Sequence, residues 1–183
     1  MSSSRVELSA RVGAAIALSI GLAWAYRSAL ELGRPNYVAP VELADWLAVV
    51  SFSVGLGLLG AAARLLADLA GRSRPIVALS WIVIIAAVVA ATANFIEDGL
   101  AVKAFGEVFA LGLFGLLAGF AGLAAMLAWR RQWRLAAVAA ATLVGLFTSV
   151  EAGGGFLILA AWLGVAVALW RQQGRRAPSG PQL

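Results

Sequence analysis

Six apolar segments, separated by short polar or glycine-rich connections, limit what this chain can fold into. They occupy approximately residues 10–30, 42–67, 75–97, 106–129, 135–151 and 156–170. A helix that crosses the hydrocarbon layer of a bilayer needs about 20 residues, within a range of about 17–25. The first four segments meet this requirement easily, and the last two are at the short end of it. The segments are continuously apolar rather than alternating, so they predict helices and not the strands of a membrane barrel.

The composition requires an apolar environment for these helices. Hydrophobic residues make up 62% of the 183 residues, and the mean hydropathy is +0.92. A soluble domain of this size has too little interior for so much apolar surface. We therefore predict an all-α polytopic membrane protein, with a single six-helix transmembrane domain over residues 1–171. The polar segment 172–183, which contains Pro-Ser-Gly-Pro, predicts a disordered tail.

The basic residues predict the orientation of the bundle in the cell membrane. If the N-terminus is cytoplasmic, 11 of the 14 basic residues fall at the inner ends of the segments, and only Arg27, Arg34 and Lys103 fall at the outer ends. The positive-inside rule then predicts that both termini are cytoplasmic. This distribution accounts for the formal charge of +5 without a nucleic-acid partner. We also expect interfacial aromatic belts, formed by Trp24, Tyr26, Tyr37 and Trp46 at the outer ends and by Trp81, Trp129, Trp133 and Trp170 at the inner ends.

The chain contains no cysteine and no histidine. Their absence excludes disulfides, thiol nucleophiles, thiolate or imidazole metal sites and imidazole acid–base chemistry. We expect no metal and no cofactor, and any proton chemistry must come from carboxylates, lysine, tyrosine or water.

Acidic residues gather at the ends opposite to most of the arginines. Seven of the nine acids lie at or near the outer ends. Some charges have a partner of opposite sign four residues away, and such pairs can neutralise each other at the edge of the membrane. These expected pairs are Glu7–Arg11, Arg27–Glu31, Arg64–Asp68 and Lys103–Glu107.

The acids without such a helical partner define the candidate site. Helical spacing places Asn94 on the same side as Glu97 and Asp98, and Thr148 on the same face as Glu151. We hypothesise an acidic cavity in the outer leaflet, in which burial raises at least one carboxyl pKa or a bound cation keeps the groups charged. The alternative is that these side chains reach outer water and lipid headgroups. The candidate ligand-binding residues are Asp45, Asn94, Glu97, Asp98, Thr148 and Glu151.

Segment 106–129 carries a face of small residues. Gly112, Gly115, Gly119 and Gly122 are spaced by three and four residues, which permits close approach of another helix. We expect packing within the chain, and the alternative is a homodimer or partner-subunit seam.

Three functions are compatible with the sequence. The first is binding or transport of a small amphipathic or cationic ligand through the acidic cavity. The second is an intramembrane enzyme in which Asp45, Glu97 and Glu151 act as general acids and bases on a lipid or isoprenoid. The third is an accessory or scaffold subunit without a ligand. For the first, the expected apolar walls are Phe52, Phe95, Phe109, Phe114, Phe147 and Phe156.

Overall fold

The computed structural model describes residues 3–31, 40, 42–148 and 153–174. Over this part the chain is helical and contains no strand, which confirms the predicted all-α class. The six α-helices are α1 (Ser3–Glu31), α2 (Leu43–Leu69), α3 (Arg74–Asn94), α4 (Gly106–Trp129), α5 (Trp133–Phe147) and α6 (Gly155–Gly174), and a π-helix η1 (Phe95–Gly99) and a 3-10 turn η2 (Lys103–Phe105) join α3 to α4.

The apolar stretches of the helices fall into two length classes. Four apolar stretches are long enough to cross a membrane, namely Ala10–Leu30, Leu43–Leu69, Arg74–Gly99 and Lys103–Trp129. The apolar parts of α5 and α6, Trp133–Phe147 and Gly155–Arg171, are shorter. Helix α6 also continues to Gly174, past the predicted start of the tail at residue 172.

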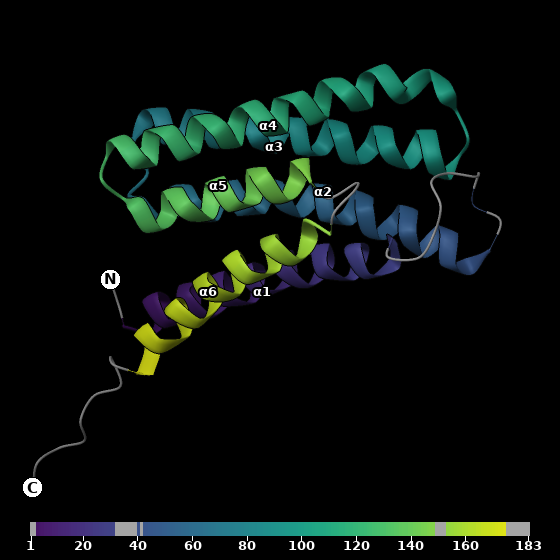
Figure 1. Ribbon diagram of the computed structural model, residues 1–183. Helices are drawn as coiled ribbons and strands as arrows, with labels where there is room; N and C mark the ends of the chain where they lie inside the picture. Colours follow the sequence, from purple (N-terminus) through teal and green to yellow (C-terminus); the bar gives the residue numbers. More distant parts are fainter. Residues whose placement is uncertain (1–2, 32–39, 41, 149–152, 175–183) are drawn as a thin grey trace, which may run out of the picture.

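The six helices form a closed ring. Each helix packs against the next one in the sequence, and α6 packs against α1. Figure 1 shows α3 and α4 side by side, α5 next to them, and α6 lying along α1. We call the end that holds connections 70–73 and 130–132 the basic end. The end at which α2 begins and η1 and η2 lie is the acidic end.

Hydrogen bonds tie together the two connections of the basic end. Arg72 has a positive φ of 51°, and its guanidinium binds Asp68 with Nε–Oδ1 and Nη2–Oδ2 distances of 2.6 and 3.0 Å. This contact raises the pKa of Arg72, through the hydrogen bond first and the charge of Asp68 second. The Arg64–Asp68 pair expected from the sequence is present at 3.4 Å. Gln132 donates a hydrogen bond from Nε2 to the Ala70 carbonyl at 3.2 Å, which links the two connections.

The glycine face of α4 packs against α3. A Cβ at Gly112 would lie 2.6 Å from the backbone nitrogen of Ala90, and one at Gly115 would lie 2.8 Å from the Ala86 Cβ. Further along, Gly119 faces Val83 and Gly122 faces Leu79. Because α3 covers all four glycines, this face is occupied within the chain.

Polar groups in the core are paired between helices. Trp24 is fully buried and donates from Nε1 to the Gly55 carbonyl at 3.1 Å, so the expectation that it belongs to an interfacial belt is wrong. Trp162 is also fully buried and donates to Thr142 Oγ1 at 3.0 Å. Ser28 Oγ accepts from the Gly155 amide at 3.0 Å. These bonds join α1 to α2, α5 to α6, and α1 to α6, and each satisfies a buried donor.

Candidate functional site

The candidate site begins where α3 ends, at the acidic end. Asn94, the last residue of α3, is 2% exposed and donates from Nδ2 to Ser53 Oγ of α2 at 3.0 Å. An amide in an apolar core costs free energy unless it is hydrogen-bonded, so this contact fixes α3 against α2. Asn94 therefore has a structural partner, and it lies three residues before Glu97 and four before Asp98.

The helix then changes its pitch. Residues Phe95–Gly99 form the π-helix η1, and the Leu100 amide then donates to the Ile96 carbonyl at 3.2 Å, which is a bond of the α-helical type. Gly99 is buried against Trp46 and Val49 of α2, since a Cβ at Gly99 would lie 3.5 Å from each side chain. Single π-helical turns are rare and occur often at functional sites. This turn sets the directions of Glu97 and Asp98.

Glu97 lies against the start of α4. A Cβ at Gly106 would lie 2.7 Å from Glu97 Oε1, so a larger residue there would require this half-buried carboxylate to move. The N-terminus of a helix carries a partial positive charge that stabilises a nearby anion. The position of Glu97 against the start of α4 therefore has a structural cause.

Asp45 lies in the first turn of α2. Its Oδ2 accepts a hydrogen bond from the Glu42 amide at 3.0 Å, which satisfies a donor at the helix start. The contact of Trp46 with Gly99 brings this turn beside η1. Asp45, Glu97 and Asp98 thus lie on neighbouring elements at one end of the bundle.

Thr148 lies at a different height. It donates from Oγ1 to the Val144 carbonyl of its own helix at 2.9 Å. The neighbouring Phe147 lines a groove with Leu117 of α4, which is 11 residues from Gly106. At 1.5 Å per residue, Thr148 is roughly 16 Å nearer to the basic end than Glu97. The structure does not bring Thr148 beside the other candidates, and Glu151 lies outside the described residues.

Arg27, which the sequence placed at the outer end of the first segment, is buried near this region. It is 8% exposed, its Cζ lies 4.8 Å from the centroid of the Phe52 ring, and its Nη1 donates to the Ala48 carbonyl at 3.4 Å. The side chain of Glu31, its expected partner, lies outside the description. A guanidinium over an aromatic face is stabilised by the ring quadrupole. The sequence signal that could have indicated this burial is that Arg27 lies within an apolar segment, three residues after Trp24.

Aromatic rings fill the interior near this end. Phe52 contacts Trp24 and Phe109 edge-on, with centroid separations of 5.8 and 6.2 Å. By contrast, Phe114 and Phe147 are 68% and 77% exposed, so they do not line an interior chamber as the sequence analysis expected. No group of three acidic residues within the described part of the chain is placed to hold a metal ion.

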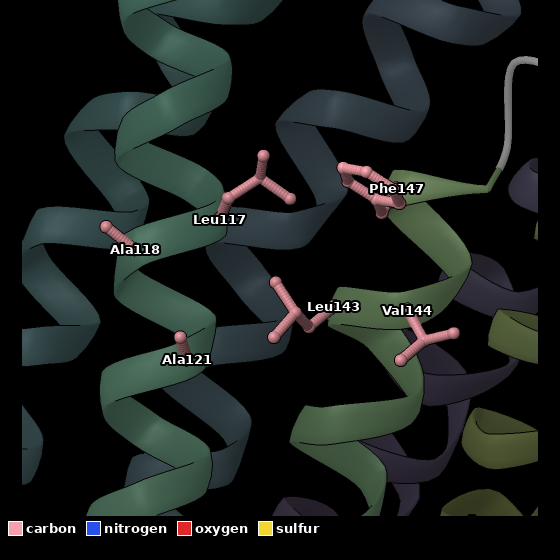
Figure 2. A pocket seen from close by; sticks show the side chains of 6 residues that line it. All are labelled: Leu117, Ala118, Ala121, Leu143, Val144 and Phe147. Carbon is pink, nitrogen blue, oxygen red and sulfur yellow. The ribbon is translucent and has the colours of Figure 1, made fainter.

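A groove lies on the outside of the ring, between α4 and α5. It has a volume of about 480 Å³ and an apolar lining, and it opens to the surface. Figure 2 shows its six side chains, which are Leu117, Ala118 and Ala121 of α4 and Leu143, Val144 and Phe147 of α5.

No protein-family model, no curated protein and no solved structure matches this chain.

Proposed function

We propose that this is a protein of the cell membrane that binds a small amphipathic, cation-bearing ligand at its acidic end. Four apolar helices of sufficient length and many exposed apolar side chains support the membrane location, among them Leu111 and Trp129 at 71% and 81% exposure. The arginines of the basic end favour an orientation in which that end and both termini face the cytoplasm. The acidic end then faces outward.

The observation that carries the ligand proposal is the π-helical turn η1. It follows the end of α3 at the level of Asp45, and its Glu97 and Asp98 are half-buried rather than fully solvated. The half-buried Glu97 carboxylate favours a cation over a neutral ligand, since a positive partner offsets the cost of its partial desolvation. The apolar side chains of Trp46 and Phe95 lie close by in sequence and are partly exposed, so they can hold the hydrophobic part of the ligand.

Binding is favoured over transport. A path through the ring would have to pass the packed rings of Trp24, Phe52 and Phe109 and the buried guanidinium of Arg27. We therefore place the ligand at the outer end of the bundle.

The test uses tetraphenylphosphonium, a lipophilic cation, and the protein in lipid nanodiscs. Equilibrium dialysis measures the cation bound by nanodiscs with and without the protein, and the difference is the binding due to the protein. Glu97→Gln and Asp45→Asn should each weaken this binding roughly tenfold, which corresponds to about 1.4 kcal/mol. Glu107→Gln is the matched control, because Glu107 is an exposed acid in the first turn of α4 at the same end.

Equal binding to all four proteins, or no more binding than to empty nanodiscs, contradicts the proposal. Far-UV circular dichroism of each variant separates loss of binding from loss of fold. Uptake of the same cation into proteoliposomes, abolished by Glu97→Gln, would instead favour transport.

A further inference from the structure

Two short connections lie side by side at the basic end. Connection 70–73 joins α2 to α3, and connection 130–132 joins α4 to α5. The hydrogen bond from Gln132 Nε2 to the Ala70 carbonyl holds one connection against the other. The arginines in and beside these connections therefore share one region of the surface, at the left of Figure 1.

Arg74 and Arg130 lie at similar levels along the bundle axis. Gly122 of α4 packs on Leu79 of α3, and these two helices run antiparallel. Arg74 is five residues before Leu79, and Arg130 is eight residues after Gly122. At 1.5 Å per residue, the two arginines differ in level by about 5 Å. This offset is shorter than an arginine side chain, so both guanidiniums can reach one anion.

The end of α4 fixes the backbone of Arg131. The Gln132 amide donates to the Leu127 carbonyl at 2.9 Å, and the Arg131 amide donates to the Ala128 carbonyl at 2.9 Å. This is the Schellman pattern, and Arg131 holds its left-handed position with a φ of 59°. The corresponding residue at the end of α2 is Gly71, the residue type that this position favours. Glycine would avoid the strain of a side chain here, so folding alone does not call for an arginine.

The positive charge of this region is not neutralised within the described part of the chain. Asp68 is the only acid in segments 64–96 and 108–150, and it is already paired with Arg64 and Arg72. The arginine cluster consists of exposed residues that form no ion pair with any described residue, namely Arg74, Arg130, Arg131 and Arg134. Four such charges together attract an anion.

Exposed tryptophans place the arginine cluster at the level of lipid headgroups. Trp129 and Trp133 flank connection 130–132 and are 81% and 65% exposed. Indole rings of membrane proteins concentrate at the membrane–water interface. Every basic residue that the sequence places at this end is arginine, and the single lysine, Lys103, lies at the acidic end. Lysine would orient the protein equally well, but the planar fork of arginine also binds two phosphate oxygens at once.

We propose that the arginine cluster binds the headgroup of an anionic phospholipid in the leaflet that the basic end faces. Guanidiniums from the end of α4 and from the start of α3 donate to the phosphate oxygens, and the indoles of Trp129 and Trp133 cover the upper part of the acyl chains. A zwitterionic lipid carries an ammonium group beside its phosphate, which the cluster repels. The inference rests on the membrane location proposed above and not on the cationic ligand.

The test is native mass spectrometry of the full chain in detergent, titrated with phosphatidylglycerol or with phosphatidylcholine of the same acyl chains. The method resolves each bound lipid and gives the Kd of the first. We expect phosphatidylglycerol to bind more tightly. Arg130→Gln and Arg131→Gly should each raise its Kd roughly fivefold. Lys103→Gln removes an exposed cation at the acidic end and should leave this Kd unchanged.

Arg131→Gly separates loss of binding from loss of fold. Glycine relieves the positive φ, so this variant should unfold at a temperature no lower than the wild type while it binds the lipid less tightly. Equal Kd values for the two lipids overturn the inference. An equal loss of binding in Lys103→Gln and Arg130→Gln also overturns it, because the effect then comes from net charge.

Two further measurements identify the source of the anion and test the premise. Inorganic phosphate, titrated into the protein by isothermal calorimetry in the same detergent, should give no saturable binding. Saturation that Arg130→Gln abolishes would identify a site for free phosphate and overturn the lipid. If a carbonate wash releases the chain from cell membranes, the membrane location itself is wrong, and the inference fails with it.

Discussion

Replacing Gly112 with alanine tests the close approach of α3 and α4. The new Cβ would lie 2.6 Å from the Ala90 nitrogen and 2.9 Å from its Cα, and a backbone cannot rotate away as a side chain can. The two helices must separate, and overpacking of this kind costs about 1–3 kcal/mol. Gly57 on α2 is the matched control, because a Cβ there meets nothing within 4 Å. Gly57→Ala should stabilise the protein by about 0.5–1 kcal/mol through helix propensity alone.

A third variant, Gly122→Ala, should have an intermediate effect on the free energy of unfolding. A Cβ at Gly122 would lie 2.9 Å from Leu79 Cδ2, the end of a flexible side chain that can move. We expect the free energy of unfolding to fall in the order Gly57→Ala, Gly122→Ala, Gly112→Ala, with about 1–3 kcal/mol between the first and the last. Unfolding by dodecyl sulfate in mixed micelles, followed by far-UV circular dichroism, gives these values. If Gly112→Ala proves as stable as Gly57→Ala, the α3 and α4 backbones are not in contact.

Two further expectations concern buried hydrogen bonds and use the same unfolding assay. Ser28→Ala removes the acceptor of the Gly155 amide and should cost about 1–3 kcal/mol, whereas Ser19→Ala on an exposed position of α1 should change little. Thr142→Val leaves the Trp162 indole N–H without its acceptor and should cost a similar amount. Adding Trp162→Phe to Thr142→Val removes that donor and should recover part of the lost free energy of unfolding. If the loss in the double variant is only the sum of the two single losses, the hydrogen bond is not the cause.

The number of helices could be predicted from the sequence, because each apolar segment is long, continuous and bounded by glycine, proline or arginine. The basic connections could be predicted for the same reason, and the Arg64–Asp68 pair follows from helical spacing. The position of each helix end along the axis of the bundle could not be predicted. Segment 135–151 has enough apolar residues for a short crossing, but α5 ends at Phe147, and only its packing on α4 shows how far it rises.

The candidate site was predictable only in part. Asp45, Asn94 and Glu97 come from segments that are adjacent in the ring, so placing them at one end required only the alternation of helix direction. Thr148 was predicted to lie at the same end, but it is displaced along the bundle axis toward the basic end. Residue spacing within one helix does not show how far that helix is offset from its neighbours. Arg27 was assigned to the outer end by its position in the first segment, and its burial over the Phe52 ring could not be predicted, because that ring belongs to another helix.

The ring closes between its first and last helices, and this has a consequence for biosynthesis. The bond from Gly155 to Ser28 joins residues 127 positions apart. At a synthesis rate of about 5–20 residues per second, α1 waits roughly 6–25 s after Ser28 is made before its partner on α6 exists. During that interval the α6-facing side of α1 has no cognate helix, so a ribosome that stalls before Gly155 leaves an open arc of five helices with that side uncovered.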